Sequence, residues 1–157
     1  MKIIDLAAPD AARLVPLLQD LHALHVTHQP ERHLPDPADE SLEHWLRDWL
    51  EQDSVTALLA ESPQGAPLGY LIYGVERRPA LPIRAAETRL MVHHLAVAEP
   101  FRRMGVGLAL LSEVKRRAKV QDIGVIATSY APFNTAAAGL FQSLGLSPVL
   151  TCAEWRA

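Results

Sequence analysis

Residues 95–107, LAVAEPFRRMGVG, carry the end of an apolar run through a glycine-containing turn into a helical pattern. The run itself, residues 88–98, is almost continuously apolar, which indicates a central strand buried on both faces. Residues 105–119 repeat their apolar positions with the period of an amphipathic helix. Gly105 and Gly107 therefore stand where a buried strand passes into the first turn of a helix.

This turn has the features of an anion site. A helix N-terminus carries about four unpaired backbone N–H groups and a partial positive charge, and both favour a phosphate. Gly105 and Gly107 leave those N–H groups open to a pyrophosphate, and Arg102 and Arg103 add positive charge. The spacing is neither that of the dinucleotide fingerprint nor that of a P-loop, and a glycine-rich turn with no ligand is the structural alternative.

The composition predicts one compact domain over residues 1–157. Apolar residues make up 49% of the chain, but no run approaches the roughly 20 apolar residues of a membrane span. The opening MKIIDLAAPD carries an acid early and lacks the apolar block of a secretory signal, so we expect a cytoplasmic protein without a membrane partner. Cys152 is the only cysteine, which excludes an intrachain disulfide and a cysteine-based metal cluster.

Charge is distributed unevenly along the chain. The formal net charge of −3 gives no general attraction to nucleic acid. Residues 31–53 hold eight acids against two arginines, a formal −6, whereas residues 99–119 hold six basic residues against two acids, a formal +4. The basic segment suits an anionic ligand and the acidic segment a cationic acceptor, although both patterns are also those of solvated helix faces.

Periodicity and turn residues predict a mixed sheet flanked by helices. The first helix follows Pro9 and ends near Gln29, and the second takes Asp39 or Ser41 as its N-cap. Gly145 is well placed to end the last helix. The order of the elements, with two helical crossovers in its second half, is typical of an α/β fold. We expect strands at residues 2–6, 55–61, 68–76, 88–98, 122–129 and 146–155, and further helices at residues 105–119 and 134–144.

Two motifs resemble those of the GNAT superfamily of acyl-CoA-dependent N-acyltransferases. Arg102, Gly105 and Gly107 fit the family's Arg/Gln-x-x-Gly-x-Gly/Ala signature, and Asn134-x-x-Ala137 with the following turn fits its later helix. The resemblance implies an α/β GNAT-like fold with a mixed, mostly antiparallel sheet of about six strands and four flanking helices. The parallel fourth and fifth strands of that fold splay apart.

The resemblance also implies that acetyl-CoA is the acyl donor. Its pantetheine arm would lie between the splayed strands, with its pyrophosphate at the N–H groups of residues 103–108. The residues expected to contact it are Leu95, Ala96, Val97, Arg102, Arg103, Met104, Gly105, Val106, Gly107, Leu108, Asn134 and Phe141.

His93 is the candidate general base. Some family members carry a glutamate at the position of Met91, and methionine cannot take a proton. Alternation along a strand places the side chain of His93 on the face of Met91 and Leu95, and imidazole titrates near neutral pH. The segment 93–107 is also similar to arylalkylamine N-acetyltransferases, whose strand-four histidine pair maps onto Met91 and His93. The structural alternative is a buried histidine bonded to a backbone carbonyl, and His94, on the opposite face, is expected to be structural.

The sequence leaves several candidates for the general acid. Many members use a tyrosine seven residues after the asparagine, and this chain has Phe141 there. The thiolate would then leave unassisted, take its proton from water, or be protonated by a hydroxyl such as that of Tyr130 or Ser129.

The resemblance implies that the acceptor is recognised by the first two helices, their connector and the later strands. His25 and His28 continue the apolar face of the first helix, so they either line the acceptor pocket or close the core. No metal is expected, because His22, His25 and His28 at spacings of three progress around the helix and lack a companion carboxylate pattern. Trp45 and Trp49 are expected to pack in the core.

These residues together predict an N-acetyltransferase that passes the acetyl group of acetyl-CoA directly to a small primary amine in a ternary complex. Two alternatives remain open: a non-catalytic acyl-CoA-binding sensor module, and a protein N-terminal or lysine acetyltransferase. Dimers are common in the family, so the resemblance allows a homodimer.

Overall fold

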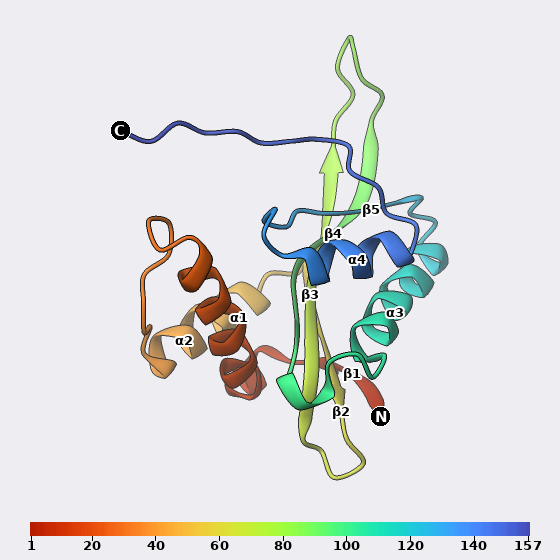
Figure 1. Ribbon diagram of the computed structural model, residues 1–157. Helices are drawn as coiled ribbons and strands as arrows, with labels where there is room; N and C mark the ends of the chain where they lie inside the picture. Colours follow the sequence, from red (N-terminus) through yellow and green to blue (C-terminus); the bar gives the residue numbers. More distant parts are fainter.

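A five-stranded sheet with the order β1-β2-β3-β4-β5 forms the centre of the computed structural model, which describes residues 1–157 (Figure 1). The first four strands pair antiparallel, and β4 and β5 pair parallel. The expected mixed, mostly antiparallel sheet is therefore confirmed. The strands are β1 (Lys2–Leu6), β2 (Val55–Glu61), β3 (Pro67–Arg78), β4 (Glu87–Val97) and β5 (Val125–Thr128).

Helices cover both faces of this sheet (Figure 1). One layer packs η1, α1 and α2 over one buried cluster, and the other packs α3 and α4 over a second cluster. The N-cap of α2 is Ala38, so the predicted caps at Asp39 or Ser41 were wrong: both residues already lie inside the helix. No helix combines the length and apolarity needed to cross a membrane. The helical segments are η1 (Ala8–Leu14), α1 (Val15–His28), α2 (Asp39–Leu50), η2 (Glu99–Phe101), α3 (Val106–Val120) and α4 (Thr135–Ser143).

β4 contains a bulge at His93. Ile72 of β3 pairs with His94, but the next residue, Tyr73, pairs with Val92, so His93 has no partner of its own. An extra residue in one strand reverses the alternation of side chains beyond it.

The bulge turns both histidines toward α1 and α2. The ring of Trp49 lies 5.4 Å from that of His93 and 5.0 Å from that of His94, whereas Leu95 packs against the cluster under α3 and α4. The predictions that His93 shares a face with Leu95 and that His94 lies on the opposite face were wrong. Strict alternation fails at a bulge, and no residue type in this stretch announces one.

β4 and β5 stay paired over only four residues. Arg89 to Val92 run alongside Val125 to Thr128, and the hydroxyl of Thr128 donates to the carbonyl of Val92 at 3.0 Å, at the end of this ladder. β4 continues to Val97 without β5 beside it. The expected divergence of two parallel strands is thus present, and it leaves one side of the β4 backbone open.

The predicted last strand, residues 146–155, is not formed. The chain turns out of α4 at Gly145, whose φ of 87° is the left-handed conformation expected at the end of a helix. Beyond it, residues 147–157 are irregular and exposed. Pro148 has no N–H to give to a ladder, and Val149 and Leu150 are adjacent apolar residues that would need cover on both faces of a sheet.

Gly69 allows β3, β4 and α3 to approach closely. A Cβ at this position would lie 2.8 Å from the carbonyl oxygen of Ala96 and 3.0 Å from a methyl of Val106. We expect Gly69→Ala to lower the free energy of unfolding by about 1–3 kcal/mol, because a backbone oxygen cannot move aside. Urea denaturation measures this change. Gly124→Ala, where nothing lies within 4 Å of the added carbon, is the control, and an equal loss there would contradict the packing explanation.

Candidate active site

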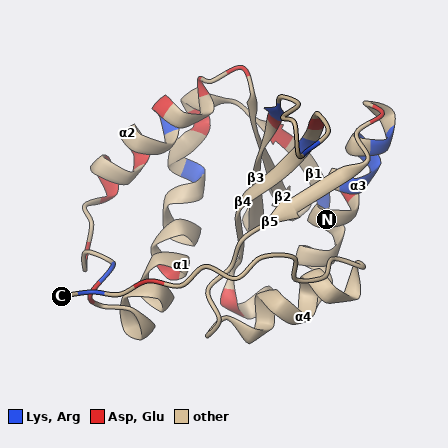
Figure 2. Ribbon diagram, turned by 90° about the horizontal axis from the view of Figure 1, so that it is seen from above, with Lys and Arg blue, Asp and Glu red and all other residues tan.

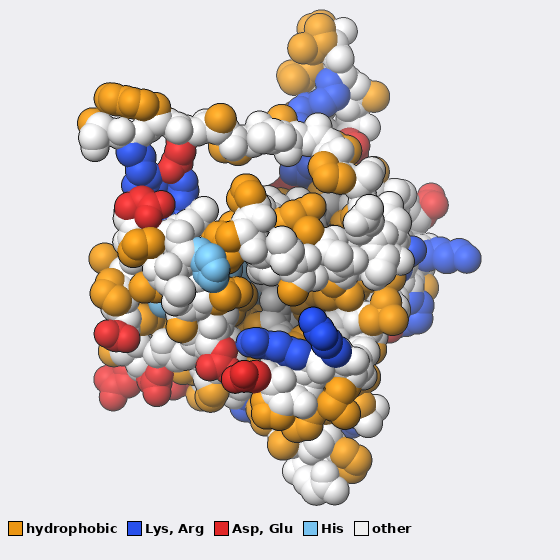
Figure 3. Space-filling model, in the orientation of Figure 1, with side chains coloured by type: hydrophobic (Ala, Val, Ile, Leu, Met, Phe, Trp, Pro, Cys, Tyr) orange, Lys and Arg blue, Asp and Glu red, His pale blue; other side chains and the backbone are white.

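A cavity of about 910 Å³ occupies the opening between β4 and β5. Its walls are the second half of β4, the residues after β5, the N-terminal ends of α3 and α4, and the facing sides of α1 and α2. Figure 3 shows this hollow in the middle of the molecule, with basic side chains at its rim. The cavity therefore spans both layers of the fold at the point where the sheet divides.

The N-terminus of α3 presents unpaired backbone amides to this cavity. The N-cap is Gly105, whose φ of 82° is left-handed, and the first helical hydrogen bond is the one from Ala109 N–H to the Gly105 carbonyl at 2.9 Å. The N–H groups of residues 105–108 make no backbone hydrogen bond. Oriented, unpaired amides at a helix N-terminus form an anion site, as the sequence predicts.

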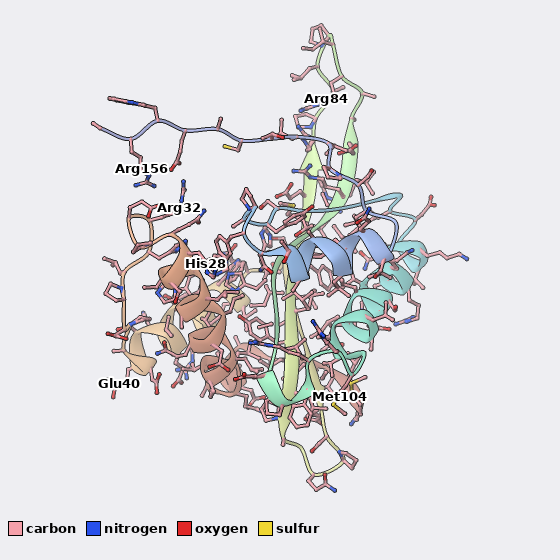
Figure 4. The ribbon with its side chains drawn as sticks, viewed as in Figure 1. His28, Arg32, Glu40, Arg84, Met104 and Arg156 are labelled. Carbon is pink, nitrogen blue, oxygen red and sulfur yellow. The ribbon has the colours of Figure 1, made fainter.

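The basic loop before α3 contributes in two ways. Arg102 donates from Nε to the carbonyl of Val97 at 3.1 Å and so ties the loop to the end of β4. Arg103 has a φ of 62°, is exposed and lines the cavity. Met104 is 69% exposed and does not line the cavity, so its side chain takes no part in the wall (Figure 4).

The far wall is formed by α4 and the loop before it. Asn134 caps α4 by accepting from the N–H of Ala137 at 3.0 Å, which leaves its side-chain NH₂ without a protein partner. Phe141 is buried, and its ring stacks on Tyr130 at 5.6 Å. Tyr130 thus places a hydroxyl-bearing ring beside the position where the sequence lacks a tyrosine.

Most of the residues expected to contact the donor are brought together around one space. Of these twelve, all except Met104 line the cavity. They come from three separate segments, namely the end of β4, the loop and first turn of α3, and α4 with its N-cap. The cavity-lining members are Leu95, Ala96, Val97, Arg102, Arg103, Gly105, Val106, Gly107, Leu108, Asn134 and Phe141.

Comparison with known families agrees with this geometry. A sequence model of the Acetyltransferase (GNAT) family matches residues 18–146, most of the chain. The chain belongs to the GNAT acetyltransferase family. No curated protein matches the sequence.

Solved GNAT-fold structures superpose on the whole chain. The tetramutant of the BH1408 protein from Bacillus halodurans gives a TM-score of 0.88 at 18% identity over 100% of both chains. The ribosomal-protein-alanine N-acetyltransferase from Brucella melitensis biovar Abortus 2308 gives 0.74 at 17% identity, also over 100% of both chains. The aminoglycoside N-acetyltransferase AAC(6')-Iy in complex with CoA gives 0.75 at 17% identity, over 99% of this chain and 93% of that one. At these identities the likeness concerns the fold.

This GNAT chain is an N-acetyltransferase that uses acetyl-CoA as its acetyl donor. The residues present fit such a donor: the free amides and arginines at α3 suit a pyrophosphate, and the unpaired side of β4 suits an extended chain with amide groups. Gly107 also has a packing role, because a Cβ there would lie 2.9 Å from Leu140 of α4.

His93 and His94 stand at the other end of the cavity. The ring of His93 makes no hydrogen bond to the protein, is exposed, and lies over Gly74, where an added Cβ would be 3.0 Å from its Nε2. A buried histidine bonded to a backbone carbonyl, the structural alternative, is therefore not what is found. His94 is largely buried, and its Nδ1 shares a hydrogen bond of 3.3 Å with the hydroxyl of Tyr70.

Burial, with smaller effects of the charges on His93 and His25, lowers the pKa of His94 to about 4. Because an unfolded histidine has a pKa near 6.5, the unfolded chain binds more protons between pH 6.5 and 4, so stability falls as the pH falls. Between pH 6.5 and 4, His94 should lower the free energy of unfolding by an amount on the order of 3 kcal/mol, and His94→Gln should abolish this part of the fall. Urea denaturation at pH 7 and pH 4.5 measures the change. The variant should keep part of the dependence of unfolding free energy on pH, because burial also lowers the pKa of His33. An unchanged pH slope would contradict the assignment.

Further aromatic rings complete this end of the cavity. His25 lies 5.3 Å from His33, and His22 lies 5.9 Å from His33, which comes from the α1–α2 connector. These three rings and Trp45 line the cavity, whereas His28 stacks on Phe133 at 4.3 Å outside the lining. Trp49 packs in the core as expected, but Trp45 is 47% exposed and forms part of the wall.

The acidic segment does not reach this space. None of the eight acids in residues 31–53 lines the cavity. Figure 2 shows acidic residues along α2. Asp20 of α1 is the only carboxylate in the wall. The sequence does not identify Asp20 or His94 as wall residues, and it favours packing in the core for Trp45. Only the packing of α1 and α2 on the bulged strand brings these side chains together.

Proposed function

We propose that this N-acetyltransferase acts on a small-molecule primary amine with an uncharged body, by direct transfer within a ternary complex. The observation that supports it most is the single cavity that joins the α3 amides to the histidine end. Its volume of about 910 Å³ is in the range of small-molecule sites. Both reactants would therefore share one continuous space, as direct transfer requires.

The low charge at the histidine end of the cavity, where we place the acceptor, supports the choice of acceptor. The imidazoles, leucines and Trp45 there offer apolar and hydrogen-bonding surface, with Asp20 as the single carboxylate. A polycation would need several carboxylates to offset the cost of desolvating its charges. Burial keeps His94 neutral near pH 7. A monoamine with an apolar body suits this surface.

We assign proton transfer to side chains near the point where β4 and β5 diverge. The nitrogen of the bound ammonium loses a proton to the free imidazole of His93, and the resulting amine attacks the carbonyl carbon of the thioester. The bond from this carbon to sulfur then breaks, the nitrogen gives up its second proton to become an amide, and the thiolate takes up a proton. Phe141 has no hydroxyl for this step, so we assign it to the hydroxyl of Tyr130, whose ring stacks on that of Phe141.

A thiol-release assay with acetyl-CoA and an acceptor panel tests the proposal. The panel contains apolar monoamines, an aminoglycoside, and peptides with a free N-terminus or a lysine. We expect release with monoamines only. Release with peptides alone would establish a protein acetyltransferase instead. Binding of acetyl-CoA without release on any acceptor would favour the sensor module.

A further inference from the structure

Three histidine rings gather at the acceptor end of the cavity. His22 and His25 come from α1 and His33 from the α1–α2 connector, and all three line the cavity. The ring of His33 lies 5.9 Å from that of His22 and 5.3 Å from that of His25. His25 is close enough to His94 for its charge to lower the pKa of that ring, so the group stands near the bulge of β4. We refer to His22, His25 and His33 as the imidazole cluster.

Backbone carbonyls fix which nitrogen of two of these rings carries a proton. The Nε2 of His22 lies 2.5 Å from the carbonyl oxygen of Leu34, and the Nδ1 of His25 lies 2.8 Å from that of Leu21. A carbonyl oxygen only accepts, so each of these nitrogens is an N–H donor. In the neutral ring the other nitrogen bears a lone pair. These lone-pair nitrogens, Nδ1 of His22 and Nε2 of His25, have no hydrogen-bond partner in the protein.

The third ring of the cluster has no hydrogen-bond partner at all. The Nε2 of His33 is shielded from solvent and unpaired. Leaving such a nitrogen unpaired costs about 1–3 kcal/mol. Burial, followed by the charges of His25 and His22, lowers the pKa of His33, so this ring is neutral near pH 7. Because no hydrogen bond holds the ring, it is free to turn toward a ligand.

Unpaired acceptor nitrogens suit a ligand that donates hydrogen bonds. A metal ion does not fit, because no three histidine, cysteine or carboxylate side chains are arranged to hold one. A second ammonium group does not fit either, since Asp20 is the only carboxylate in the wall and is itself exposed to solvent. A hydroxyl group is neutral, and a ring nitrogen can replace the water that accepts its hydrogen bond. The cluster therefore fits an alcohol.

We propose that the imidazole cluster binds a hydroxyl group on the body of the acceptor, which narrows the substrate class to amino alcohols. This inference rests on the proposed function, because it places the acceptor at this end of the cavity. The hydroxyl donates its hydrogen bond to a free ring nitrogen of the cluster, while the amine of the same molecule lies at His93. Leu21 and Leu24 of α1, which also line the cavity, contact the apolar carbons between the two groups.

Matched acceptors test the hydroxyl in the thiol-release assay. The series runs from aminopropanol to aminooctanol, and each member is compared with the alkylamine and the methyl ether of the same chain length. The methyl ether keeps the oxygen but cannot donate. At the length that fits, kcat/KM of the amino alcohol should exceed that of both analogues by at least about tenfold, because only a donor satisfies the lone pairs. Ratios near one at every length, or a diamine that surpasses its amino alcohol, would overturn the proposal.

Phenylalanine substitutions assign the preference to the cluster. His25→Phe and His33→Phe keep a planar ring but remove its nitrogens, and each should bring the ratio of kcat/KM for amino alcohol and alkylamine close to one. His28→Phe is the matched control, since His28 of α1 bonds to the carbonyl of Leu24 as His25 bonds to that of Leu21, but lies outside the cavity lining (Figure 4). It should keep the wild-type ratio. A ratio that survives in both cluster variants, or that His28→Phe lowers equally, would contradict the assignment to the cluster.

Nitrogen NMR of the imidazoles separates this inference from the proposed function. Addition of an amino alcohol to the CoA-bound protein should shift the resonances of the free nitrogens of His22 and His25, and the alkylamine of the same length should leave them in place. If acetyl-CoA bound but no amine of the series were acetylated, the proposed function would fail, and the spectra would still decide whether the cluster binds a hydroxyl. Absence of a shift with every amino alcohol would overturn the proposal.

Discussion

Replacing Gly105 by glutamate is expected to weaken acetyl-CoA binding by at least about a hundredfold, equivalent to about 3 kcal/mol. The φ of 82° at Gly105 disfavours any side chain, and a carboxylate at the N-cap of α3 would repel the pyrophosphate proposed to lie there. Calorimetric titration with acetyl-CoA measures the change.

Two further variants separate the causes of this effect. Gly65→Glu carries the same charge at the same φ of 82°, in the turn between β2 and β3 and outside the cavity, so it should bind acetyl-CoA normally. Gly105→Ala adds the backbone strain without the charge and should weaken binding less than Gly105→Glu. An unchanged dissociation constant of acetyl-CoA for Gly105→Glu would contradict the placement of the pyrophosphate at the start of α3.

Removing the imidazole of His93 is expected to lower kcat by about 10²–10⁴-fold, the usual contribution of a positioned base. Acetyl-CoA affinity should stay within about twofold of the wild-type value, since His93 lies at the far end of the cavity from the α3 amides. Steady-state kinetics of His93→Ala with the best amine of the panel, from pH 6 to 9, measure this.

The control is His44→Ala, because the side chain of His44 on α2 is exposed and outside the cavity. It should leave kcat unchanged. If His93→Ala kept the wild-type rate and pH profile, the base would have to be another group, and Tyr130 or a water molecule would replace His93 in the assignment.

The sheet and the donor end of the site follow from local patterns in the sequence. The apolar run of β4, the two glycines and the helical period after them place the α3 N-terminus correctly, and Gly145 ends the last helix where expected. These features depend on residues close together in the chain. Five of the six expected strands form, and the sixth, at residues 146–155, does not, because Pro148 cannot donate to a ladder and the adjacent apolar Val149 and Leu150 do not alternate.

The acceptor end depends on packing that no local pattern encodes. The bulge at His93 is a mismatch between two strands, so it appears only when β3 and β4 are paired. His33 comes from the connector and meets His25 only because α1 and α2 pack side by side. For the same reason, the sequence shows that residues 31–53 are acidic but does not show whether their side chains face the cavity.

The most direct test of the account is calorimetric titration of the wild-type protein with acetyl-CoA. We predict saturable binding of one molecule per chain, which a pyrophosphate-containing fragment of CoA should inhibit competitively. Absence of saturable binding, or binding that such a fragment leaves unchanged, would contradict a donor site between β4, β5 and the start of α3.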